Sequence, residues 1–118
     1  MRIGIANDHR GVDAKEIISK YLIEKGYGVV NYGTDTKDAV DFPDYAYKLG
    51  KGVLNKEVDL GIAICGTGIG MSIALNKMKG IYCAKVSKES EAVLSKAHNN
   101  ANVIAISEET DKDLMLSI

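Results

Sequence analysis

The sequence has few of the residues that staple a small fold or bind a metal. Its 118 residues contain two cysteines, one proline, one phenylalanine and no tryptophan. Cys65 and Cys83 are too few and too far apart for a disulfide framework or a paired metal-ligand motif. We therefore expect a reduced protein that folds on a hydrophobic core, without disulfides, metal or cofactor.

An excess of charge of either sign is also missing. Fifteen lysines and arginines stand against sixteen aspartates and glutamates, so the formal net charge is −1. This balance gives no basic footprint for nucleic acid, and no apolar run is long enough to cross a bilayer. The first residues read directly into a strand, which leaves no room for a signal peptide. We expect a cytoplasmic protein that binds neither nucleic acid nor membranes.

What is present is ordinary globular usage, with 46% hydrophobic and 26% charged residues. The length suits one domain over residues 1–118. Apolar runs predict strands at 2–6, 28–32, 60–65, 82–86 and 102–106. Helical spacing and end signals predict helices at 12–25, 43–54, 71–76 and 88–97, with Ser87 as an N-cap and a short last helix at 111–118. Strands that are apolar on both faces and alternate with helices indicate an α/β fold whose parallel sheet is covered on both sides.

Polar residues follow three of these strands. Asp8 and His9 follow the first, residues 65–70 follow the third, and Glu108 and Glu109 follow the fifth. In open α/β sheets, ligands bind beyond the carboxyl ends of the strands, so we expect a site there. A further polar run at 98–100 ends a predicted helix instead, which places it at the opposite edge or against a neighbouring subunit.

The most distinctive local feature is the alternation of Gly66, Gly68 and Gly70 between a strand and a helix. Backbone N–H groups in such a loop, together with the helix N-terminus, favour an anion. The spacing fits neither a Walker A loop nor a dinucleotide fingerprint. Either a plain tight turn or a cradle for an anion or oxyanion explains it, and three glycines exceed what a turn needs, which favours the cradle.

The side chains beside this loop each allow a chemical and a structural interpretation. Cys65 is a candidate thiolate base or nucleophile, or a small buried hydrophobe, whereas Cys83 is expected in the core. His9 and His98 suit proton transfer, or they are caps or solvated side chains. Asp8 is an orienting carboxylate or forms an Asx turn. No regular ligand spacing indicates a zinc site.

Taken in order, five segments resemble one known family. They are residues 7–11, 41–46, 65–74, 76–77 and 98–103. The sequence resembles the type-B ribose-5-phosphate isomerase family, which also contains the galactose-6-phosphate isomerase subunits. Those subunits typically lack the cysteine of the glycine block, so the ribose-type branch is the closer likeness.

The resemblance implies a three-layer α/β/α sandwich of the Rossmann or flavodoxin type. The resemblance also implies that the protein forms a homodimer or a tetramer with active sites shared between subunits. The implied reaction is a metal-free aldose–ketose isomerisation of a sugar phosphate, most closely ribose 5-phosphate to ribulose 5-phosphate through a cis-enediolate. In that scheme Cys65 is the base, and His98 of the partner opens the sugar ring. The enediolate oxygens are held by Thr67 and the loop of Gly66, Gly68, Ile69 and Gly70, and other sugar oxygens are bound by Asp8, His9 and Asn99.

The sequence also departs from the family pattern. Family members carry an arginine for the substrate phosphate where Glu109 stands here, and they continue into a longer final helix and a basic tail. Carboxylates beside a phosphate repel it, whereas an arginine holds it. Arg10 offers a replacement, although a solvated Arg10 is the simpler interpretation. These departures leave open a non-catalytic or altered-specificity relative that binds a sugar. A thiol-dependent hydrolase or redox protein is a weaker third hypothesis.

Overall fold

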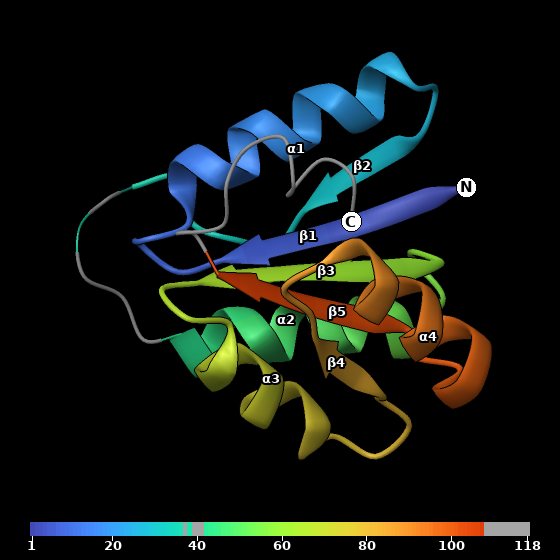
Figure 1. Ribbon diagram of the computed structural model, residues 1–118. Coiled ribbons are helices and arrows are strands. Elements are labelled where there is room, and N and C mark those ends of the chain that lie inside the picture. The colour runs from blue at the N-terminus through green and yellow to red at the C-terminus, as the bar shows by residue number, and fades with distance from the viewer. Residues whose placement is uncertain (37, 39–41, 108–118) are drawn as a thin grey trace.

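The apolar runs of the sequence form a parallel sheet in the computed structural model (Figure 1), which describes residues 1–36, 38 and 42–107, without the side chains of residues 89, 97 and 98. The strands are β1 (Arg2–Asn7), β2 (Gly28–Asn31), β3 (Leu60–Cys65), β4 (Cys83–Lys85) and β5 (Val103–Ser107). All pair in parallel, in the order β2-β1-β3-β5-β4. The flavodoxin order is 2-1-3-4-5, so β4 and β5 are exchanged here, and β1, β3 and β5 lie together in the middle of the sheet.

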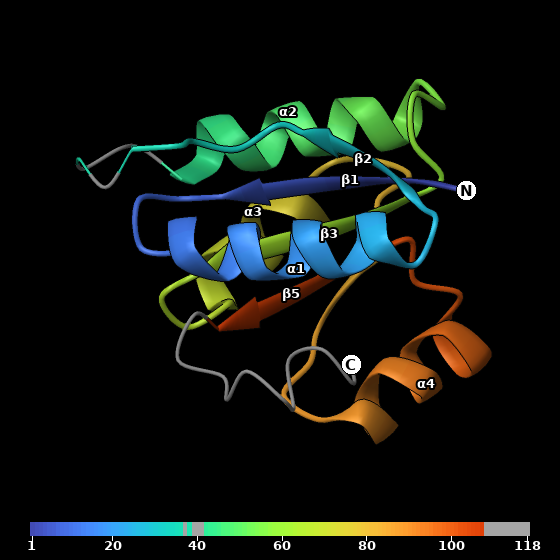
Figure 2. The same ribbon diagram turned by 90° about the horizontal axis from the view of Figure 1, so that it is seen from above.

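Four helices cover the two faces of this sheet in the described part of the chain. They are α1 (Val12–Glu24), α2 (Phe42–Leu54), α3 (Ile69–Asn76) and α4 (Glu89–Asn99). Helices α1 and α4 cover one face of the sheet, and α2 and α3 cover the opposite face (Figure 2). One apolar cluster joins each pair of helices to the sheet. The predicted three-layer α/β/α sandwich with five parallel strands is therefore confirmed.

The two faces differ in the size of the strand side chains, because successive residues of a strand point to opposite faces. Toward α2 and α3 the strands present small side chains, and the helices fill the space with Leu49, Met71 and Leu75, each fully buried. Toward α1 and α4 the strands present isoleucines. On β3, Ile64 therefore faces α1 and α4, whereas Cys65 faces α3 and lies at the end of the strand.

Two predicted details are wrong and a third lies outside the described residues. Helix α3 begins at Ile69, two residues before the predicted start. Helix α4 is capped by Lys88, whose backbone is extended, and not by Ser87. Ser87 instead donates its N–H and its hydroxyl to Oε1 of Glu91. The helix predicted at 111–118 is not described. Within the described ranges, no helix combines the length and the apolar character needed to cross a membrane.

Candidate active site

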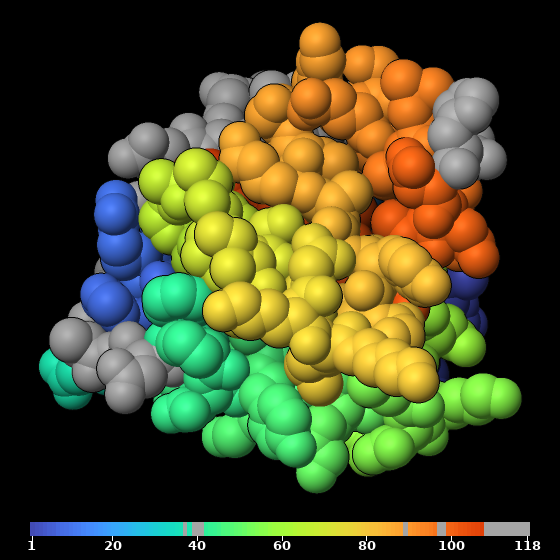
Figure 3. All heavy atoms as spheres, turned by 90° about the horizontal axis from the view of Figure 1, so that it is seen from below, coloured from blue at the N-terminus to red at the C-terminus, as the bar shows by residue number. Residues whose placement is uncertain are grey.

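The carboxyl ends of the three central strands bring three separate segments of the chain to one edge of the sheet. Cys65 at the end of β3 pairs with Ser107 of β5, and Asn7 at the end of β1 pairs with Ile64 of β3. The residues after β1 (blue in Figure 3) therefore lie at the same edge as those that lead into α3 (yellow-green). We refer to this side as the carboxyl edge, and to the opposite side, where the strands begin, as the amino edge.

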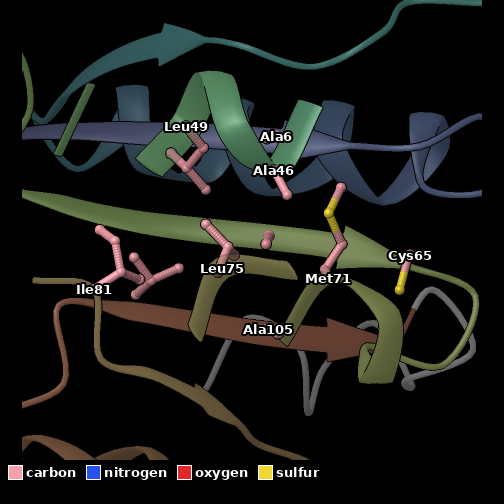
Figure 4. Close-up of a cluster of buried hydrophobic side chains, with 10 residues drawn as sticks. Ala6, Ala46, Leu49, Cys65, Met71, Leu75, Ile81 and Ala105 are labelled. Atoms are coloured by element: carbon pink, nitrogen blue, oxygen red, sulfur yellow. The ribbon is translucent and has the colours of Figure 1, made fainter. Parts of the chain in front are cut away.

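Cys65 lies where the hydrophobic core meets this edge. The residue is 5% exposed, whereas its cluster neighbours Met71 and Ala105 are 0% exposed. In Figure 4 it lies at one end of the cluster, where β3 leads into the loop before α3. Its Sγ accepts a hydrogen bond of 3.1 Å from the N–H of Gly68. The side chain thus packs like a small hydrophobe on one side and faces the glycine loop on the other.

A side chain at any of the three loop glycines would meet a different neighbour. Gly68 is the N-cap of α3 and has a left-handed backbone (φ 83°), and a Cβ there would lie 3.0 Å from the carbonyl carbon of Ile106. A Cβ on Gly70 would meet the ring of Phe42 at 3.0 Å. A Cβ on Gly66 would lie 2.5 Å from Nη1 of Arg10. Packing therefore explains the glycines at positions 68 and 70, whereas at position 66 the neighbour is the end of a flexible side chain.

The loop is held by hydrogen bonds that the sequence did not reveal. The Ser107 hydroxyl donates to the carbonyl oxygen of Gly66 at 2.6 Å, which ties the loop to the end of β5. The N–H of Ile69 donates to Oγ1 of Thr67 at 3.2 Å. Thr67 and Ile69 are both exposed, so the outer side of the loop is open to solvent.

Asp8 forms the Asx turn that was one of its two interpretations. Its Oδ1 accepts the N–H of Arg10 at 2.9 Å, as in an Asx turn, and its carbonyl oxygen accepts the N–H of Gly11. The residue is 7% exposed, and His9 beside it is half-buried. Arg10 is exposed as a residue, yet its guanidinium lies against Gly66. This turn therefore places the Arg10 guanidinium against the glycine loop, with Asp8 and His9 in the same turn at the carboxyl edge.

Behind this turn lies a polar network that sequence reasoning missed. Asn7 is fully buried, and its Nδ2 donates to the carbonyl oxygens of Asp8 and Thr34, while its Oδ1 has no hydrogen-bond partner in the described structure. Lys15, 4% exposed on α1, donates to the Thr34 carbonyl oxygen at 2.6 Å and to Asp35. The hydrogen bonds that Asp35 accepts from Lys15 and from Asn31 hold the pKa of its carboxyl below its usual range. The only sequence signal was a lysine on the buried face of a predicted helix.

His98 and Asn99 are not brought to this site within one chain. They lie in the last turn of α4, which leads into the start of β5, and Asn99 is exposed. The five residues of β5 span roughly 16 Å between the two edges. The predicted position at the amino edge is therefore confirmed. Glu108 and Glu109 lie outside the described residues.

Cys83 lies half-buried at the start of β4 and packs against the core, as predicted. Burial raises the pKa of its thiol to about 12, so it is unreactive near neutral pH. Among the side chains that the structure describes, no three of the histidine, cysteine, aspartate or glutamate type gather as a metal site would require.

Comparison with known proteins decides the family. Residues 3–118 match the family model described as Ribose/Galactose Isomerase. The chain belongs to the ribose/galactose isomerase family. The resemblance identified from the motifs is thereby confirmed.

Named relatives and a solved structure agree with this membership. Ribose-5-phosphate isomerase B of Escherichia coli is 42% identical over 104 residues, which cover 88% of this chain and 70% of that protein. Probable ribose-5-phosphate isomerase B of Mycoplasma genitalium is 46% identical over 107 residues, which cover 89% and 70%. The solved structure of Clostridium thermocellum ribose-5-phosphate isomerase B matches with a TM-score of 0.98 and 43% identity, covering 100% of this chain and 80% of that one.

Proposed function

We propose that this protein interconverts an aldose phosphate and a ketose phosphate, with ribose 5-phosphate and ribulose 5-phosphate as the pair. The observation that carries the proposal is the loop of residues 65–70, which opens at the carboxyl edge in a member of the ribose/galactose isomerase family. Relatives named ribose-5-phosphate isomerase B favour this pair of sugars. We further propose that the reaction needs no metal and passes through a cis-enediolate.

The proposed base is the thiolate of Cys65. Isomerisation requires a base that removes the proton at C2 of the open-chain sugar and returns it at C1. The Cys65 sulfur lies on the side of the core that faces the glycine loop. An N–H donor directed at a sulfur interacts more strongly with a thiolate than with a thiol. The Gly68 N–H is such a donor, at 3.1 Å. The exposed surface of Cys65 is small, so we expect the sugar to enter above Gly66 and Thr67.

The proposed role of the loop is to hold the negative charge that develops on oxygen. As the proton leaves carbon, charge moves to O1 and O2, and preorganised donors stabilise it best. The loop offers the exposed Thr67 hydroxyl and the backbone N–H groups of Gly66 and Gly70, near the start of α3, where the helix dipole adds positive potential. The Gly68 N–H is directed at Cys65 and the Ile69 N–H at Thr67, so these two hold the base and the hydroxyl in place. Removing one such donor typically costs about 3–4 kcal/mol of barrier.

The remaining proposed groups bind and open the sugar. Asp8 and His9 follow β1 at the same edge as the loop, and their side chains suit sugar hydroxyls. His98 and Asn99 lie at the other edge, so we propose that a second copy of the chain presents them and that the protein is a homodimer. Exposed apolar side chains support such an interface, with Ile69 52% and Ile73 55% exposed on α3.

The test is turnover of ribose 5-phosphate by the wild-type protein, Cys65→Ala and Cys83→Ala. We expect Cys65→Ala to fold but to lose at least about 100-fold in kcat, the usual contribution of a general base. Cys83→Ala is the matched control and should retain turnover. Activity in Cys65→Ala equal to that of the wild type would overturn the assignment of the base.

A second candidate follows from Glu109, which stands where the family resemblance predicts a phosphate-binding arginine. A relative with altered specificity would bind a sugar without converting ribose 5-phosphate. Assays with ribose 5-phosphate, galactose 6-phosphate and the unphosphorylated sugars separate the two. Turnover of ribose 5-phosphate at rates typical of enzymes, about 1–1000 per second, excludes the non-catalytic alternative.

A further inference from the structure

A sugar-phosphate isomerase needs a cation for the phosphate, and arginine is scarce in this chain. The sequence contains two arginines, Arg2 and Arg10, which flank the single strand β1. Arg2 begins the strand at the amino edge, and Arg10 lies three residues beyond its end at the carboxyl edge. A guanidinium is therefore placed at each edge of the sheet, and that of Arg10 is on the side of the glycine loop.

The contact between Arg10 and the glycine loop is close. A Cβ on Gly66 would lie 2.5 Å from Nη1, 2.9 Å from Cζ and 3.3 Å from Nε of Arg10. Three atoms of the guanidinium at such similar distances mean that the group lies over Gly66, in the space that a side chain would fill. The Asx turn between Asp8 and the Arg10 N–H fixes the backbone from which this side chain extends.

Two lysines near this edge are less suited to the same task. Lys15 is 4% exposed, on the buried face of α1. Lys85 ends β4, which is separated from β3 by β5, so its strand lies roughly 10 Å from that of Cys65. Arg10 extends from β1, the direct neighbour of β3. Arg10 and Lys85 are both exposed, and of these three side chains it is Arg10 whose contact with the loop is described.

We propose that Arg10 binds the phosphate group of the substrate and thereby sets the preference for a phosphorylated sugar. This inference rests on the proposed isomerase function. A guanidinium offers two parallel N–H donors to two phosphate oxygens, a geometry that an ammonium lacks. It also offsets the buried carboxylate of Asp8, which would otherwise repel a phosphate dianion at this edge.

The test compares Arg10→Ala and Arg10→Lys with Arg2→Ala, the matched control at the opposite edge. We expect Arg10→Ala to raise the KM for ribose 5-phosphate and the inhibition constant of inorganic phosphate by about 10- to 100-fold, as for loss of a charged hydrogen bond. The KM for unphosphorylated ribose should stay within about twofold, and Arg10→Lys should recover part of the loss. Arg2→Ala should match the wild type.

A second variant tests the contact itself. Gly66→Ala places a methyl group where the guanidinium lies, and the flexible Arg10 side chain can move aside without unfolding the protein. We expect Gly66→Ala to weaken phosphate inhibition in the wild type but to add nothing in the Arg10→Ala background, because both changes act on one group. If Gly66→Ala and Arg10→Ala weaken phosphate inhibition by fully additive amounts in the double variant, the contact between Arg10 and Gly66 is contradicted.

The outcomes separate this inference from the proposed function. The inference is wrong if Arg10→Ala leaves the KM for ribose 5-phosphate and the inhibition constant of inorganic phosphate within about twofold of the wild type. It is also wrong if Arg10→Ala raises the KM for ribose and for ribose 5-phosphate equally. In either case the isomerase function stands. If the wild type converts no sugar, the proposed function fails. Titration of inorganic phosphate by phosphorus NMR then decides the inference: binding that is lost in Arg10→Ala supports it, and equal binding in both proteins overturns it.

Discussion

The two edges of the sheet use the same residue type in opposite ways. At the amino edge, Asn76 donates its Nδ2 to the carbonyl oxygen of Cys83, and its Oδ1 accepts the Cys83 N–H, both at 2.8 Å. Asn102 similarly donates to the Gly80 carbonyl oxygen and accepts the Tyr82 N–H. At the carboxyl edge, the buried Asn7 leaves its Oδ1 without a partner in the described structure.

This difference shows where stability and function are separated in the fold. The amino edge is closed by asparagines whose donor and acceptor are both satisfied, which is what stability requires. The carboxyl edge gathers a buried carboxylate, a thiol, a left-handed glycine and a guanidinium. We therefore expect changes at Asn76 and Asn102 to reduce stability alone, and changes at the carboxyl edge to reduce activity beyond their effect on stability.

The largest effect expected on stability comes from Gly68→Ala, compared with Gly26→Ala at the amino edge. Both glycines have positive φ, at 83° and 91°, but a Cβ on Gly26 meets nothing within 4 Å, whereas one on Gly68 crowds the backbone of Ile106. Chemical denaturation should show a loss of about 1–2 kcal/mol for Gly26→Ala and about 1–3 kcal/mol more for Gly68→Ala. Gly68→Ala should also lose turnover, and equal losses of stability in the two variants would contradict the crowding.

A smaller effect is expected from Asn76→Ala at the amino edge. The change removes both hydrogen bonds to Cys83, which should lower the free energy of unfolding by about 1–2 kcal/mol. Asn55→Ala, at an exposed position after α2, serves as the control. Turnover per folded molecule should be unchanged in both. A loss of kcat in Asn76→Ala without a loss of stability would contradict the claim that Asn76 at the amino edge serves stability alone.

The smallest effect concerns the ion pair of Lys15 and Asp35. Because the pKa of Asp35 is lowered in the folded state, its contribution to stability is present above the unfolded pKa of about 3.9. It is lost as the pH falls through the folded value. The Tm difference between the wild type and Asp35→Asn should therefore persist at pH 7 and vanish in acid, whereas Glu16→Gln on the exposed side of α1 should show no such trend. A Tm difference that grows as the pH falls would contradict a lowered pKa of Asp35 in the folded state.

Most of the fold could be predicted from the sequence because each strand is a short apolar run bounded by polar or glycine-rich segments. The predicted start of α3 is two residues too late because glycine is a poor helix former, yet a left-handed Gly68 can cap a helix that begins at Ile69. The exchange of β4 and β5 in the sheet could not be predicted, because the apolar pattern does not encode which strands are neighbours.

The candidate site was only partly predictable. The rule that parallel strands end at one edge was enough to bring Asp8, His9 and Cys65 together. It could not place the guanidinium of Arg10 over Gly66, since that contact depends on a turn and a side-chain conformation. Nor could it reveal that Asn7 and Lys15 support the turn from behind, because their partners lie 19 to 27 residues away in the sequence.

The most direct test of the central claim is the reaction of ribose 5-phosphate in deuterium oxide, followed by NMR. If the Cys65 thiolate takes the C2 proton and the resulting thiol exchanges it with solvent during the lifetime of the enediolate, the wild type and Cys83→Ala should introduce deuterium at C1 of ribulose 5-phosphate, and Cys65→Ala should introduce none. Deuterium introduced by Cys65→Ala at the wild-type rate would contradict the account.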